Sequence, residues 1–233
     1  MKGVPPTGLS KWAVRLITLI ILGTAGFLLS GYDSLPDLLP VHFKPGGAPD
    51  GWQYRTPTRV LLPVFVELAL AMLLGAVGTL LLSRPHGDQD PKAPDVLAAG
   101  TAAEAVFLIA LIWVAFQGYA AWSLNWVWVH GRAGLGLIYD YVELSAATLT
   151  VVVAIRANIH LGTPAPRPYV AAHWRFGQLY KNPEDPALFV PTRNGRRWTL
   201  NFGRPVAAAL LGLILAVGIV GPTVILAAFL RTR

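Results

Sequence analysis

The sequence predicts an all-α membrane protein with five transmembrane helices. Of its 233 residues, 54% are hydrophobic and only 13% are charged, whereas soluble domains carry about 25% charged residues. The apolar residues gather in runs that, at about 20 residues, are long enough to cross a hydrocarbon core of about 30 Å. The alternating segments of about ten residues that build a membrane β-barrel are missing from the sequence. These observations favour a polytopic helical protein.

Five apolar stretches are the predicted spans: residues 12–29, 60–82, 96–122, 134–157 and 205–230. The basic N-terminal segment is similar to that of a signal peptide, but no small-x-small cleavage site follows the first run, so we expect this helix to be retained. The predicted organisation is a four-helix region with a motif loop (1–157, loop 30–59), a basic loop (158–204) and a fifth helix with a tail (205–233).

The distribution of positive charge predicts the orientation. If the N-terminus is cytoplasmic, the cytoplasmic segments hold 13 Lys and Arg residues and the outer segments hold 6. Because cytoplasmic loops carry the excess of Lys and Arg, we predict a cytoplasmic N-terminus, an extracytoplasmic loop 30–59 and a cytoplasmic loop 158–204. The net charge of +7 then points to anionic lipid headgroups at the cytoplasmic face as partners, and not to nucleic acid.

Several kinds of site are excluded by the sequence. The chain has no cysteine, which rules out disulfides, thiolate catalysis and cysteine-ligated metals. Neither the Walker pattern nor the dinucleotide glycine pattern occurs, and there is no HExxH motif. Polar groups in unusual places remain as the candidates.

Four carboxylates lie inside the predicted spans: Glu67, Glu104, Asp140 and Glu143. A charge at the centre of a membrane helix costs at least about 2.5–3.5 kcal/mol, so these groups must face one another, a polar cavity or a cation, or be protonated. Asp140 and Glu143 are three residues apart and share a helix face. With Glu67 they fall in the outer half of the bundle, which predicts a polar pocket below the loop that carries His42.

That loop contains LPDLLPVHFKPGGAPDGW, residues 35–52. Its Leu-Pro pairs favour extended backbone, and its Gly-Gly and Asp-Gly steps favour turns, so we predict a rigid Pro/Gly-rich cap. His42, Asp50 and Trp52 of the cap, together with Asp140 below it, are the candidate ligand-binding residues.

The motif His42-Phe43, followed by Gly47 and by PDGW at residues 49–52, resembles the extracytoplasmic signature of the SdpI-like family of bacterial integral membrane proteins. The resemblance implies a multi-pass protein of the prokaryotic inner membrane. The named member of that family is an immunity protein against a secreted peptide toxin, and it also signals by sequestering a repressor. The first functional expectation is therefore a non-enzymatic protein of immunity or signalling type that binds a peptide or lipid ligand in the outer pocket.

Two other functions stay open. His42, Glu67, Asp140 and Glu143 supply the nitrogen and oxygen ligands that zinc accepts. In a membrane-embedded metallohydrolase or protease, Glu143 and Glu67 would be the catalytic carboxylates beside a metal-bound water. This alternative requires a divalent cation such as zinc, although the sequence does not determine the cofactor. In the third alternative, the same groups form the relay of a proton- or cation-coupled transporter.

The basic loop contains WRFGQLYKNPEDPALFVPTRNGRRWTLNFGRP, residues 174–205. Residues 188–191 and 197–202 read as short strands joined by an Asn-Gly turn, which predicts a small cytoplasmic β-hairpin. This stretch also resembles a short uncharacterised domain that often accompanies the SdpI-like loop.

Overall fold

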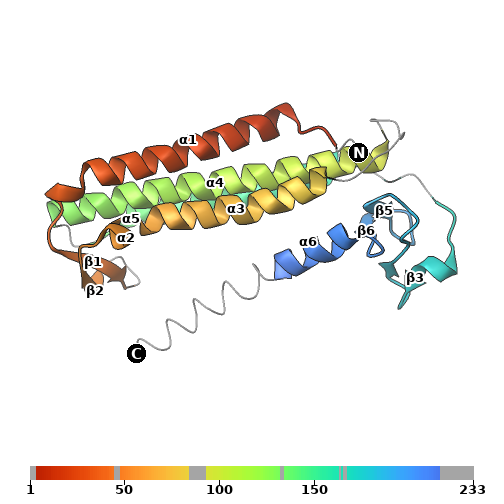
Figure 1. The fold of residues 1–233 in the computed structure, drawn as a ribbon. Coiled ribbons are helices and arrows are strands. Elements are labelled where there is room, and N and C mark those ends of the chain that lie inside the picture. The colour runs from red at the N-terminus through yellow and green to blue at the C-terminus, as the bar shows by residue number, and fades with distance from the viewer. Residues whose placement is uncertain are drawn as a thin grey trace. The chain divides into compact units, whose positions relative to one another are not determined.

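Four long apolar helices dominate the structure, a computed structural model that describes residues 4–44, 48–83, 93–131, 134–162, 164 and 167–215. They are α1 (Gly8–Ser30), α3 (Leu62–Leu82), α4 (Pro94–His130) and α5 (Leu137–His160) (Figure 1). Each is long and apolar enough to cross a membrane. The predictions of a mostly helical chain and of a multi-pass membrane protein are therefore confirmed.

The predicted fifth span begins with α6 (Pro205–Leu215), and the rest of that span lies outside the described residues. Pro205 suits the first turn of a helix, because the N–H group that proline lacks has no partner there. The predicted fifth crossing and the predicted side of the membrane for each terminus stay predictions.

Helix α4 is longer than the predicted span 96–122, because it continues through the Trp-rich segment that follows that span. Between Trp122 and His130 there is no proline or glycine to end it. Aromatic rings spaced four residues apart lie along this last part, with centroid separations of 5.8 Å for Trp122–Trp126 and 3.9 Å for Trp126–His130. Such pairs support a helix, and Gly131 follows in the left-handed conformation (φ +57°) that commonly ends one.

The chain divides into two compact units, which are described separately. One comprises Gly8–Gly75 and Ala105–Arg156, and the other comprises Met1–Thr7, Ala76–Glu104 and Ala157–Arg233.

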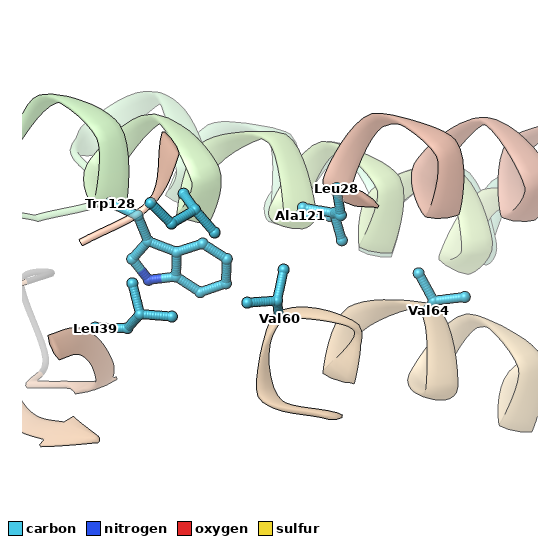
Figure 2. Close-up of a cluster of buried hydrophobic side chains, with 7 residues drawn as sticks. Leu28, Leu39, Val60, Val64, Ala121 and Trp128 are labelled. Atoms are coloured by element: carbon cyan, nitrogen blue, oxygen red, sulfur yellow. The ribbon is translucent and has the colours of Figure 1, made fainter. Parts of the chain in front are cut away.

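In the first unit, the predicted cap is a β-hairpin made of β1 (Leu38–Phe43) and β2 (Pro49–Tyr54), preceded by a short 3-10 helix, η1 (Tyr32–Ser34), and followed by α2 (Pro57–Val60). Leu39 of β1 is fully buried in a cluster with residues of α1, α2, α3 and α4, and Figure 2 shows it near Trp128 and Val60. The indole N–H of Trp128 also donates a 2.9 Å hydrogen bond to the carbonyl of Pro40. The hairpin is therefore packed onto the helices and is not a loose loop.

The second unit contains two small antiparallel hairpins. The predicted hairpin is confirmed as β5 (Phe189–Pro191) paired with β6 (Trp198–Leu200). A further hairpin, β3 (Trp174–Arg175) paired with β4 (Leu179–Tyr180), was not predicted. It follows a short 3-10 helix, η2 (Ala171–His173).

One buried side chain organises this region. The Nδ2 group of Asn201 donates to the carbonyls of Asn182 (2.8 Å), Asp185 (3.1 Å) and Ala187 (3.1 Å). Its Oδ1 accepts hydrogen bonds from the backbone N–H groups of Asn182 (3.0 Å) and Gly203 (2.9 Å). Asn201 thus joins the segment before β5 to the turn after β6.

Asn201→Asp should unfold this region, because a carboxylate would face three carbonyl oxygens where an amide now donates. We expect a loss of at least about 3 kcal/mol, given that each buried unsatisfied polar group costs about 1–3 kcal/mol. The measurement is hydrogen-exchange protection of the amides in β4–β6. Asn194→Asp is the matched control, since Asn194 uses only an oxygen acceptor, Oδ1, in its bonds to Thr192 and Arg196. Equal protection in the two variants would contradict the assigned role of Asn201.

Candidate functional site

The β1–β2 hairpin brings two predicted site residues together. The Nδ1–H group of His42 donates a hydrogen bond to Oδ1 of Asp50, and both side chains are accessible to solvent. In the strand register His42 lies opposite Gly51. A Cβ atom at position 51 would lie 2.9 Å from the Cβ atom of His42, closer than carbon atoms pack. The Asp-Gly step of the motif therefore provides both the partner of His42 and the space for it.

The same hairpin carries an apolar face that the fold leaves exposed. Leu38 pairs with Tyr54 across the strands, and Pro40 pairs with Trp52. Because successive side chains of a strand alternate between faces, burial of Leu39 turns its neighbours away from the helices. Leu38, Trp52 and Tyr54 are accordingly 50%, 52% and 73% exposed. Trp52, a predicted ligand-binding residue, is thus available to a ligand.

Glu67 lies at a junction of α1, α3 and α4. Its side chain is fully buried, and its Oε1 atom accepts a 2.8 Å hydrogen bond from the hydroxyl of Thr24 on α1. A Cβ atom at Gly118 of α4 would lie 3.4 Å from Oε1 of Glu67 and 3.2 Å from Cγ2 of Ile20. Among the described residues, Oε2 of Glu67 has no hydrogen-bond partner. The predicted polar group is therefore present inside the bundle, with one oxygen atom uncommitted.

Asp140 and Glu143 lie on α5, and both are exposed. This helix contacts α4 through Tyr139, whose ring centroid is 5.5 Å from that of Phe116 and 6.3 Å from that of Tyr119. Within the described ranges, no three His, Asp or Glu side chains are grouped so that they could hold a metal ion. The predicted zinc set therefore gains no support from the structure and stays a prediction.

Sequence reasoning missed Thr24, Gly118 and Asn201. A Thr or Gly in an apolar helix is common, so neither gives a distinct signal. The partners of Asn201 come from its folded surroundings and follow no motif. Only the periodic placement of Gly118, Ala121 and Trp128 on one face of α4 indicates which side of that helix meets α1 and α3.

Two family models match parts of the chain. Residues 19–66 match a domain of unknown function (DUF1648), and residues 183–207 match a family of unknown function (DUF5808). No curated protein and no solved structure matches the chain. The first region runs from within α1 through the β1–β2 hairpin and ends one residue before Glu67. The second contains β5, β6 and Asn201, so both matches coincide with regions that the structure shows to be locally organised.

Gly118→Val should destabilise the junction at Glu67, because the added methyl groups would collide with Ile20 and the carboxyl group. Overpacking of this kind costs about 1–3 kcal/mol, measured as a lower melting temperature of the full chain in detergent micelles. Gly26→Val on α1 is the control, since no neighbouring atom lies within 4 Å of a Cβ atom placed there. If both variants had the melting temperature of the wild type, the close packing of α4 against Glu67 would be refuted.

Proposed function

We propose that the protein is a non-enzymatic, multi-pass protein of the prokaryotic inner membrane, of SdpI-like type, whose β1–β2 hairpin binds an extracytoplasmic peptide. The observation that carries this proposal is the exposed face formed by Leu38, Trp52 and Tyr54. Exposed aromatic side chains at rigid positions are typical anchors for ligands. The packing of Leu39 and the hydrogen bond from Trp128 hold this face in place before any ligand arrives.

The hairpin favours a peptide over other ligands. Among the described residues it is a sheet of two strands, so each strand has a strand neighbour on one side there. An extended peptide can add to the other edge through backbone hydrogen bonds. Side chains of the peptide would then meet Trp52 and Tyr54, and the His42–Asp50 pair offers a polar contact near the turn. The DUF1648 match covers this hairpin, which is also the region that resembles the signature of the SdpI-like family.

A screen of short linear peptides displayed on phage, with the full chain held in nanodiscs, tests this function. We expect enriched peptides whose affinity falls roughly 30-fold in Trp52→Ala, since truncating a central aromatic anchor costs about 2 kcal/mol or more. Tyr141→Ala is the control, because Tyr141 is also an exposed aromatic residue but lies on α5. Failure to enrich any peptide, or equal binding by Trp52→Ala and wild type, would contradict peptide recognition by this face. Selective loss of bound bilayer lipid from Trp52→Ala would instead identify a lipid ligand.

A second candidate function is proton- or cation-coupled transport, and the buried carboxyl group of Glu67 favours it. Ionisable groups inside membrane spans are rare, and ion and proton pathways are among the functions that they serve. Thr24 engages one oxygen of this group, and the other is uncommitted among the described residues. A transported ion or proton is one candidate to occupy it.

Liposomes that contain the full chain and an internal pH indicator test transport. An imposed proton or sodium gradient should give a flux that Glu67→Gln abolishes, because the amide keeps an acceptor for Thr24 but cannot exchange a proton or bind a cation as a carboxylate does. Glu184→Gln, which removes an exposed carboxyl group outside the membrane spans, is the control. Absence of flux in the wild type, or full flux in Glu67→Gln, would exclude this candidate.

A further inference from the structure

A cavity of about 790 Å³ lies between the turns of the two small hairpins in the second unit. Trp174 and Gly177 line it from the β3–β4 side, and Arg193, Arg196 and Arg197 line it from the β5–β6 side. Its volume is within the range of about 300–1,000 Å³ that is typical of small-molecule sites. Neither the proposed peptide site nor Glu67 involves any of these residues.

The turn that carries the three arginines is held in a fixed conformation. The Oδ1 atom of Asn194 accepts from the hydroxyl of Thr192 (2.7 Å) and from the backbone N–H of Arg196 (3.1 Å). Thr192 and Arg197 are joined through their backbone groups at 2.8 Å. The guanidinium group of Arg193 lies 4.8 Å from the ring centroid of Tyr169. The backbone of this turn and the guanidinium group of Arg193 are therefore positioned before a ligand binds.

Charge in this region is unbalanced. Within the described part of the chain, the nearby carboxylate of Asp185 is ion-paired with Arg167 (2.9 Å), and it also accepts a 3.1 Å hydrogen bond from the hydroxyl of Tyr180. Burial raises the pKa of the Tyr180 phenol, so this phenol stays protonated and acts as the donor. None of the described residues lining the cavity is acidic. Three guanidinium groups around one cavity match a phosphate group, which arginine binds through paired hydrogen bonds.

The position of the cavity in its unit favours a phosphate on a membrane lipid. Phe189 of β5 packs against Val96 and Ala99 in α4. The indole N–H of Trp198 lies 3.1 Å from the carbonyl of Leu161 and 3.0 Å from that of Gly162, just past the end of α5. The β5–β6 hairpin is thus attached to the ends of helices that are suited to cross a membrane, which is where headgroups lie.

The β3–β4 turn adds a second feature. Phe176, next to Gly177 of the cavity, is 95% exposed and has φ +50°. A left-handed conformation is unfavourable for a bulky residue, so the turn holds an aromatic ring in the open at a conformational cost. An aromatic ring at the boundary of a bilayer can enter the interfacial layer.

We infer that the cavity between these two turns binds the phosphate-bearing headgroup of an anionic membrane lipid, with Arg193, Arg196 and Arg197 around the phosphate and Phe176 inserted beside it.

In the experiment, the full chain is placed in nanodiscs of phosphatidylcholine with phosphatidylglycerol. Native mass spectrometry then releases the protein and counts the lipid molecules that remain bound to it. Arg196→Gln should reduce retained phosphatidylglycerol roughly tenfold, as expected for a lost charge-assisted hydrogen bond. Lys181→Gln removes the same charge from an exposed residue outside the cavity and should have a much smaller effect. Phe176→Gly relieves the left-handed turn and should still reduce retention.

A second arm adds inorganic phosphate or glycerol phosphate to the chain in nanodiscs of phosphatidylcholine alone. Weak or absent binding of these soluble phosphates supports a lipid ligand. Saturable binding of a soluble phosphate that Arg196→Gln removes would overturn the lipid proposal and identify a soluble phosphate ligand. Equal losses in Arg196→Gln and Lys181→Gln would overturn the cavity as the site, as would absence of retained phosphatidylglycerol. Hydrogen-exchange protection of the amides around Asn201 reports whether each variant folds. If Arg196→Gln does not fold, Arg197→Gln replaces it in the experiment.

Discussion

The attachment of the β1–β2 hairpin to α4 determines what the first unit can present to its surroundings. Leu39 enters the cluster formed by Leu28, Val60 and Trp128, and the indole of Trp128 holds the carbonyl of Pro40. A shift of one residue in a strand would send every side chain to the opposite face. Burial of Leu39 therefore fixes the exposed position of Trp52. Trp128 contributes to this attachment because α4 continues to His130.

Glu67 poses a different energetic question. A charge at the centre of a membrane helix costs at least about 2.5–3.5 kcal/mol, whereas a hydrogen bond between membrane helices contributes about 0.6 kcal/mol on average. The bond from Thr24 is thus too weak to offset a charged Glu67 by itself. An apolar residue would serve the packing of α1, α3 and α4 at least as well. Packing and the bond from Thr24 therefore do not by themselves account for a carboxyl group at this junction.

Hydropathy and turn signals in the sequence were sufficient to predict the four long helices and the β5–β6 hairpin, because these elements depend on the local sequence pattern. The end of α4 could not be predicted in the same way: its tryptophans suit a membrane interface, and the sequence does not say whether such residues lie in a helix or a turn. Clustering of Glu67 with Thr24 and Gly118 depends on the rotation of three helices about their axes, which composition does not specify. The pairing of His42 with Asp50 likewise follows from the strand register.

Both matched regions contain a polar side chain beside a glycine that cannot be replaced without a clash. In the first region this glycine is Gly51 against His42, and in the second it is Gly203, where a Cβ atom would lie 2.4 Å from the carbonyl carbon of Asn182. Asn201 and Asp50 each satisfy hydrogen bonds that hold the local fold. These motif residues therefore have structural reasons for their spacing that require no chemistry. In the proposed functions, ligand recognition is assigned to side chains that the fold leaves exposed, which are Trp52 and Tyr54 on the β1–β2 hairpin and the arginines of the β5–β6 turn.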